Sequence, residues 1–367
     1  MSAFTMPELF QAYYDCRRNK RTTRAQLAFE QRMERNLARL CRRLNDRSYE
    51  IGPTRAFVIT HPKYREVWAG QFPDRVVHHV MYNRIFERFA RGFIFDTYAC
   101  IPGRGVMFGA NRVHRMMRQA TENWQRPAYV IQADLANFFV SIDKAALKAL
   151  ALPRIPKPDT AWLTQMIIDH DPTVDPKLRS SAELFARVPR HKSLFNAPDG
   201  KGLPIGNLSS QYFANVYLDP IDQYAKRELG IRWYARYVDD IVLIGHSMRE
   251  LNEQFAALRD FAERRLHLRF HPNKTRRGRV HDGINFCGRI LKPFRQYLRR
   301  STAQSMFEAA MDQEADPQLW HDRVNSYLGQ ARHANTYRLR RSLARRCGAA
   351  FGPRFVKLAP LENQPCT

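Results

Sequence analysis

Two adjacent carboxylates, Asp239 and Asp240, stand inside a segment with the pattern of a β-hairpin. Residues 232–244 are rich in aromatic and β-branched residues, which favour strands, and Tyr237 and Val238 directly precede the carboxylates. Neighbouring unpaired carboxylates repel each other, so this placement favours a divalent cation as their counter-charge. An ordinary Asp-Asp surface turn is the alternative that this segment alone leaves open.

Asp134 adds a third carboxylate, because it ends a predicted strand over residues 129–134. A strand ending in one Asp, beside a hairpin that turns through two, can bring three carboxylates together. Two magnesium ions held there would lie about 3.5–4 Å apart, one activating an attacking oxygen and one stabilising a leaving oxygen. Magnesium prefers hard oxygen ligands, so carboxylates and substrate phosphates suit it. The pattern predicts phosphoryl transfer with two Mg²⁺ ions.

The elements that must position these carboxylates follow from the hydrophobic periodicity. Helices are predicted over residues 8–46, 75–93, 208–227 and 248–266, from Lys144 onward, and through most of the chain after about Ser301. Strands are predicted over residues 55–60, 65–69 and 129–134, and as a short pair over 283–291. The stretch 153–202 is rich in Pro, Asp and Lys, which indicates an excursion between two core elements.

The charge of the chain indicates a polyanionic partner. Its net charge of +25 comes from 60 Lys and Arg against 35 Asp and Glu. Such an excess destabilises a compact chain by self-repulsion, and a nucleic acid is the natural counter-charge. Arginine dominates and clusters, and its guanidinium binds phosphate in a bidentate manner and stacks on bases. A merely soluble basic surface is the weaker alternative.

Composition also narrows the compartment. No stretch reaches the ~18 uninterrupted apolar residues of a membrane span, and residues 1–24 lack the apolar core of a secretion signal. We therefore expect no membrane partner. The cysteines are scattered without a C-x-x-C pair, which argues against a zinc site or disulfide framework and fits a reducing cytoplasm; they are Cys16, Cys41, Cys100, Cys287, Cys347 and Cys366.

Six short segments, in order along the chain, resemble the motifs of reverse transcriptases: residues 64–67, 72–77, 134–142, 237–240, 272–275 and 285–288. The resemblance implies an α+β right-hand polymerase whose palm is built on an antiparallel sheet. Its parts would be an N-terminal basic helical extension (1–54), fingers (55–128), a palm (129–295, with the 153–202 excursion) and a helical basic thumb (296–367). The thumb helices, with the run 338–346, would grip the template–primer duplex, and arginines that merely accompany helix packing are the alternative.

Within that family, the segment 202–211 resembles the enzymes of bacterial diversity-generating retroelements. Ile205 stands where many reverse transcriptases have Gln before the Gly, and Ser210-Gln211 replaces their Ser-Pro. Other segments similar to that group are 98–105, 192–195 and 326–329, although Ile101 and Val140 depart from its pattern. The resemblance implies a bacterial or phage-encoded enzyme that copies RNA into cDNA with errors at template adenines. It also implies a structured template RNA and a small basic accessory protein as partners.

The matching motif positions imply metal-binding roles. Asp134 and Asp239 would be the main metal ligands, assisted by the backbone carbonyl of Leu135. Asp240 would either bind metal or hold the hairpin by hydrogen bonds.

Further motif positions imply contacts with the incoming nucleotide. Arg65 and Arg75 would neutralise its triphosphate. For both arginines a solvated surface position is the alternative, and Arg75 could instead pair with Asp74. Lys274 would donate a proton to departing pyrophosphate, or would simply be a charge at a helix end.

Phe139 would lie under the sugar of the deoxynucleotide (dNTP) and reject a 2′-hydroxyl. The alternative is a core position, since Phe138 and Phe139 are both candidate core residues and one of the two is expected to be buried. Ile205, Gly206 and Gln211 would line the nucleotide site. An isoleucine at position 205 can only pack, where a glutamine could hydrogen-bond near the nascent base pair, and this loosens discrimination.

Three other functions remain open. A reverse transcriptase of retron or phage-defence type is the nearest, although those enzymes usually keep the Gln before the Gly. A non-catalytic RNA-binding protein with a decayed palm is a rival of another class, disfavoured by the three carboxylates. An RNA-templated RNA polymerase is disfavoured by Phe139.

Overall fold

The computed structural model describes residues 3–18, 23–61, 63–312, 316–360 and 362. The described ranges do not include Cys366 or residues 19–22 of the predicted helix 8–46. They also leave out residues 1–2 of the predicted extension 1–54, and residues 313–315, 361 and 363–367 of the predicted thumb 296–367. The chain forms two compact units. The first unit comprises Met1–Phe95, Asp134–Glu228 and Ala256–Pro272, and the second unit comprises Asp96–Ala133, Leu229–Phe255 and Asn273–Thr367.

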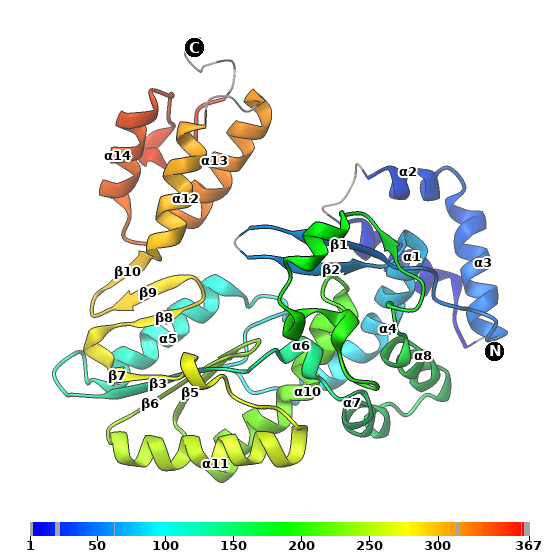
Figure 1. Cartoon of the computed structure of the whole chain (residues 1–367), viewed down its shortest axis with the longest axis horizontal. Coiled ribbons are helices and arrows are strands. Elements are labelled where there is room, and N and C mark those ends of the chain that lie inside the picture. Colours follow the sequence, from blue (N-terminus) through cyan, green and yellow to red (C-terminus); the bar gives the residue numbers. More distant parts are fainter. Residues whose placement is uncertain (1–2, 19–22, 62, 313–315, 361, 363–367) are drawn as a thin grey trace. The chain divides into compact units, whose positions relative to one another are not determined.

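The chain combines helices with largely antiparallel sheets, which confirms the α+β prediction (Figure 1). The α-helices are α1 (Met6–Arg17), α2 (Arg24–Glu30), α3 (Met33–Asn45), α4 (Phe72–Ala90), α5 (Val106–Ala120), α6 (Phe138–Ser141), α7 (Lys144–Ala151), α8 (Pro158–Asp169), α9 (Ala182–Ala186), α10 (Leu208–Gln223), α11 (Met248–Leu266), α12 (Arg300–Met311), α13 (Pro317–Ala331) and α14 (Tyr337–Cys347). The strands are β1 (Arg55–Ile59), β2 (Arg65–Ala69), β3 (Tyr129–Asp134), β4 (Lys177–Leu178), β5 (Trp233–Tyr237), β6 (Asp240–Gly245), β7 (Arg276–Arg279), β8 (Ile284–Phe286), β9 (Arg289–Lys292) and β10 (Arg295–Leu298). Within the described ranges, no helix combines the length and the apolar character needed to cross a membrane.

The predicted helix over 8–46 is wrong as a single element, because α1, α2 and α3 replace it. Thr23 is extended and precedes α2, and the backbone of Arg32 leaves the helical region just before α3. The leucines of α3 are buried while its arginines face outward, which is the amphipathic pattern that suggested a helix. Periodicity identifies such a face but does not reveal where the helix axis changes direction.

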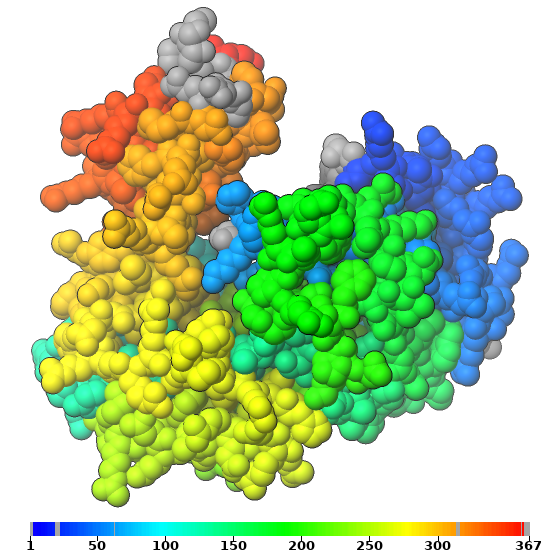
Figure 2. All heavy atoms as spheres, viewed as in Figure 1, coloured from blue at the N-terminus to red at the C-terminus, as the bar shows by residue number. Residues whose placement is uncertain are grey.

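The predicted excursion over 153–202 is partly folded onto the first unit. Its helix α8 buries Leu163, Ile167 and Ile168, and its short strand β4 pairs in parallel with β1. Figure 2 shows much of this segment, in green, on the visible surface. The Pro-rich composition therefore concealed one core helix.

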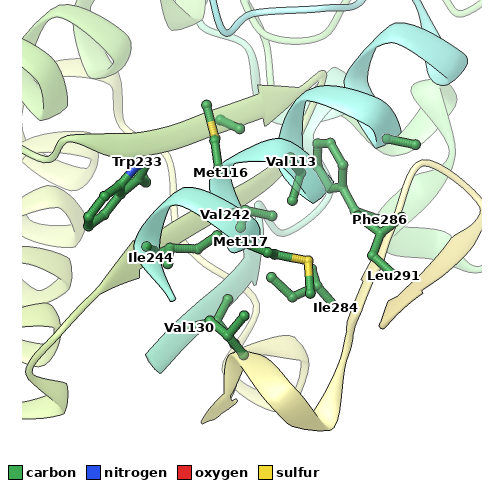
Figure 3. Packing of buried hydrophobic residues seen from close by; sticks show 14 of the residues in the cluster. Val113, Met116, Met117, Val130, Trp233, Val242, Ile244, Ile284, Phe286 and Leu291 are labelled. Atoms are coloured by element: carbon green, nitrogen blue, oxygen red, sulfur yellow. The ribbon is translucent and has the colours of Figure 1, made fainter. Parts of the chain in front are cut away.

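A four-stranded sheet in the order β5-β6-β3-β7 carries the predicted carboxylates. Helix α5 of the second unit packs on it, with Val113, Met116 and Met117 lying against side chains such as Val130 and Val242 (Figure 3). The β5–β6 and β3–β7 pairs are antiparallel, as predicted for the palm. This apolar layer holds the strand ends on which the carboxylates lie.

The helices after Arg300 form a separate small core in the second unit. Met306, Val324, Leu328 and Leu343 are fully buried in it. Arg340, in the run expected to grip a duplex, is instead buried at 5% exposure, and its guanidinium binds Thr336 and the backbone carbonyl of Arg354. Part of the arginine run therefore serves helix packing, and its exposed arginines are Arg338, Arg341, Arg345 and Arg346.

Candidate functional site

The predicted carboxylate hairpin forms, and its two-residue turn begins one residue before the Asp-Asp pair. Tyr237 pairs with Asp240 as the last pair of β5 and β6, so Val238 and Asp239 form the turn. Val238 has a φ of 54°, in the left-handed region. This conformation is costly for a β-branched residue, and backbone strain of this kind concentrates at functional sites. All four residues are half-buried.

Arg236 supports this turn by a hydrogen bond, and it was not among the residues predicted from the sequence. Its side chain is fully buried, and its Nη1 donates a 3.0 Å hydrogen bond to the carbonyl of Val238. Its own backbone bonds to the carbonyl of Asp96 and to the amide of Tyr98. Arg112 in turn binds the Asp96 carboxylate at 2.9 and 3.1 Å. The sequence signal that could have identified Arg236 is a single basic residue among the apolar and aromatic residues of β5.

We expect Arg236→Met to lower the free energy of unfolding by about 1–3 kcal/mol, because the half-buried carbonyl of Val238 loses its donor. Urea denaturation would measure the change. Arg249→Met is the control: that arginine is exposed and, among the described residues, forms an ion pair with Glu253 of its own helix, so its loss should cost less than about 0.5 kcal/mol. Equal effects of the two substitutions would contradict the role of Arg236.

Asp134 ends strand β3, which lies beside β6 in the sheet. Because β6 begins at Asp240, neighbouring strands of one sheet carry the predicted carboxylates. The backbone around Asp134 is fixed on both sides: its carbonyl accepts from the amide of His271 at 2.7 Å, and Leu135 forms a bridge with Phe270.

The metal site itself stays a prediction. Among the described residues, no three or more His, Cys, Asp or Glu side chains are grouped as a metal site requires. The donors are nevertheless the hard oxygens that Mg²⁺ prefers, and they lie on adjacent strands of one sheet. The residues therefore suit such an ion in type and in strand position.

The predicted residues Ile205 and Gly206 lie against strand β2 in the first unit. The carbonyl of Ile205 accepts a 2.7 Å hydrogen bond from the amide of Trp68. Gly206 has a φ of 129°, and a Cβ there would lie 2.7 Å from the carbonyl oxygen of Trp68, so only glycine fits. Asn207 then binds the amide of Gly70 through its side chain. This double attachment fixes the side chain of Ile205 at a half-buried position.

Phe139 joins the same part of the first unit. Its carbonyl accepts from the amide of Leu203 at 2.9 Å, which ties it to the segment that leads to Ile205. Its ring is half-buried and 5.3 Å from the ring of Phe138. Phe138 is buried at 3% exposure, which confirms it as the core member of the pair. Gln211 is exposed in the first turn of α10.

The two predicted triphosphate-binding arginines are available as cations. Arg65 is exposed at the start of β2, and Arg75 is half-buried in the first turn of α4. Neither makes an ion pair with another described residue. The alternative pairing of Arg75 with Asp74 is absent; the Asp74 carboxylate instead accepts a 2.5 Å hydrogen bond from the hydroxyl of Tyr49, and burial raises its pKa. Arg75 thus keeps its charge for another partner.

Arg75→Ala should raise the KM for dNTP by about 10- to 150-fold, because a charged hydrogen bond contributes about 1.5–3 kcal/mol. Steady-state primer extension over a range of dNTP concentrations measures it. Arg88→Ala is a matched control on the same helix, since Arg88 is exposed in the last turn of α4. A KM unchanged by Arg75→Ala would rule out contact with the triphosphate.

Two further predicted segments lie in the second unit. Lys274 is exposed in the 3₁₀ turn Pro272–Lys274, before β7. Segment 285–288 forms the predicted hairpin, since β8 and β9 pair antiparallel around Cys287 and Gly288, both with positive φ. The side chain of Gln132 holds this hairpin to β3 by bonding both the carbonyl and the amide of Asn285.

Comparison with known proteins agrees with these features. Residues 61–291 match the sequence model of the family described as reverse transcriptase (RNA-dependent DNA polymerase). No curated protein matches the chain.

Among solved structures, apo telomerase from Candida tropicalis is similar with a TM-score of 0.52 at 9% identity, covering 80% of this chain and 55% of that one. A form of the same telomerase truncated from its C-terminal domain has a TM-score of 0.43 at 12% identity, covering 68% and 56%. This chain thus spans little more than half the length of these structures, and the first likeness supports the polymerase fold alone.

Proposed function

Because this chain belongs to the reverse transcriptase (RNA-dependent DNA polymerase) family, we propose that it copies an RNA template into cDNA. Members of the family are nucleotidyltransferases that polymerise DNA on RNA. The observation that most strongly supports this activity is the placement of the strained Asp239-Asp240 hairpin and of Asp134 on neighbouring strands of one sheet.

In this proposal Asp134 and Asp239 hold two Mg²⁺ ions, with the carbonyl of Leu135 assisting and Asp240 either binding metal or bracing the turn. When bound, the ions supply activation of the primer hydroxyl and neutralisation of the pyrophosphate that leaves. The protein's own part is to keep its carboxylate oxygens in place. Arg236 does this for the turn, through Val238.

The remaining predicted residues would bind and select the dNTP. Arg65 and Arg75 neutralise its triphosphate, and Lys274 gives a proton to the leaving pyrophosphate. Phe139 blocks a 2′-hydroxyl beneath the sugar, while Ile205, Gly206 and Gln211 line the site. The attachment of the 202–207 segment to β2 and to Phe139 supports a common neighbourhood for Phe139, Ile205 and Gly206 in the first unit.

Primer extension on a defined RNA template, with magnesium and four dNTPs, tests the activity. We expect template-dependent cDNA that grows with time and fails to form without the template. Extension with ribonucleotides alone would favour an RNA polymerase. RNA binding without any extension, also after addition of a small basic accessory protein, would favour a non-catalytic binder.

We further propose that the enzyme belongs to a bacterial or phage diversity-generating retroelement and makes errors at template adenines. Ile205 and the Ser210-Gln211 pair support this subclass by resemblance. The fixed backbone of Ile205, bound to Trp68, leaves an apolar side chain where a polar one could read the nascent base pair. A structured template RNA and a small basic accessory protein would be its partners, in the cytoplasm.

Ile205→Gln should lower the error frequency at template adenines severalfold while errors at the other bases change little, because the amide restores a directed hydrogen bond. Sequencing of cDNA from one defined RNA measures both. Ile205→Val serves as the control that keeps an apolar side chain. An adenine error rate unchanged by Ile205→Gln would exclude Ile205 as the cause, and accurate wild-type extension would favour the retron or phage-defence type.

A further inference from the structure

An aromatic surface in the second unit takes no part in the proposed reaction. It consists of His114, Trp124, His281 and Phe294, and we refer to these four residues as the Trp124 patch. The Trp124 ring centroid is 5.6 Å from those of His114 and Phe294 and 6.4 Å from that of His281. Three side chains from separate segments thus meet around one indole.

Hydrogen bonds hold the two histidines of the Trp124 patch. His114 bonds through Nε2 to the carbonyl of Lys292 at 2.9 Å, and His281 bonds to the carbonyl of Trp124 at 3.3 Å. The indole is partly buried against the core under α5. The indole and the two histidines are therefore held by contacts with the fold, and the exposed ring of Phe294 lies against that indole.

Phe294 presents most of its ring to solvent from a strained turn position. It lies in the two-residue turn between β9 and β10, has a φ of 64° and is 74% exposed. That turn position favours glycine or asparagine, so a bulky ring there is costly to the fold. Figure 2 shows the β8–β10 segment, in yellow to amber, on the visible surface. An unfavourable backbone that presents an aromatic ring to solvent points to a binding function.

The charges around the patch select the partner. Lys292 and Arg295 flank the turn that contains Phe294, and Arg279 of β7 lies opposite Tyr129, the first residue of β3, in the sheet. None of these three cations has a carboxylate partner among the described residues. Of the acids close in sequence to Trp124 and His281, Glu122 is paired with Arg126, and the Asp282 carboxylate accepts from the amide of Arg279. Free cations beside an exposed ring suit phosphates and bases together, the combination that binds single-stranded nucleic acid.

We propose that the Trp124 patch binds an unpaired stretch of RNA outside the copied duplex. One base stacks on Phe294 while Lys292, Arg295 and Arg279 contact its phosphates. The patch lies near the first residue of β3 and Asp134 is the last, so about 17 Å of strand separates them. The choice of RNA over DNA rests on the proposed function; binding of a single strand does not.

Photocrosslinking tests this without any polymerisation. The full-length protein, with no nucleotides present, is titrated with a short oligouridylate carrying 5-iodouridine, and crosslinked peptides are mapped by mass spectrometry. We expect crosslinks on the peptides containing Trp124 and Phe294. Phe294→Ala should raise the oligonucleotide concentration needed for half-maximal crosslinking about 5- to 150-fold, which corresponds to the loss of one base stack. Failure of the polymerase proposal would leave this readout unaffected.

Matched variants separate stacking from other roles. Phe294→Tyr should bind as wild type and Phe294→Leu as Phe294→Ala, while Tyr14→Ala, which removes a 53% exposed ring in the first unit, should change nothing. Thermal unfolding of Phe294→Gly would confirm that the turn survives. Crosslinks confined to other peptides, or full binding by Phe294→Leu, would overturn the proposal. If the protein forms a dimer that Phe294→Ala abolishes, the patch binds a second copy of the chain instead. Tighter binding of a DNA oligonucleotide of matching sequence would overturn the choice of RNA.

Discussion

Asp239→Asn is expected to lower the rate of RNA-templated primer extension by at least about 10³-fold, a loss of about 4 kcal/mol of transition-state stabilisation. Asparagine has the size of aspartate, so the turn with Val238 should persist. Its neutral amide cannot supply the anionic oxygen that a magnesium ion needs. Single-turnover extension with excess enzyme measures the chemical step directly.

Two comparisons make this result specific. Asp175→Asn, at an exposed position in the first unit, should extend primers at the wild-type rate. Asp240→Asn distinguishes its two possible roles: a loss as large as that of Asp239→Asn indicates a metal ligand, and a small loss with lower stability indicates a brace for the hairpin. Extension by Asp239→Asn within tenfold of wild type would contradict the assigned active site.

Phe139→Ala should increase the use of ribonucleotides relative to deoxynucleotides by about 10- to 100-fold, because removing the ring removes a steric penalty of about 1–3 kcal/mol against the 2′-hydroxyl. The backbone of Phe139 is held by Leu203, so the change should act through the side chain. Competitive incorporation of ribo- and deoxynucleotides on one template measures the ratio.

Phe138→Leu provides the adjacent control. Phe138 is buried, so its substitution should lower stability and leave sugar selection unchanged. Greater use of ribonucleotides by Phe138→Leu than by Phe139→Ala would transfer the selecting role to Phe138. No change of the ratio in either variant would remove the argument against an RNA polymerase.

Several elements could be predicted closely because their signals are local. The strand Tyr129–Asp134 and the helix Met248–Leu266 begin and end at the predicted residues, and the hairpin turns at Val238-Asp239. Alternation, helical periodicity and turn residues are properties of neighbours in the chain. The order of the family's motifs is equally a property of the sequence, and family membership was predicted from it.

Contacts between distant segments were not predictable in this way. The side chain of Asn207 binds the amide of Gly70, Tyr49 binds the Asp74 carboxylate that was the alternative partner of Arg75, and Arg340 turns inward. Each depends on which segments the fold brings together, and no periodicity encodes that choice.

The sequence by itself therefore determined the polymerase family, the α+β class and the candidate carboxylates, since these follow from residue types and local order. The tertiary structure decided that Arg236 supports the carboxylate turn and that Arg75 forms no ion pair with Asp74, whose carboxylate binds Tyr49. It also decided that Trp124 and Phe294 meet at the surface, although 170 residues of sequence separate them. Burial, hydrogen bonding and ring contact are set by partners far away along the chain, and only the folded backbone brings those partners together.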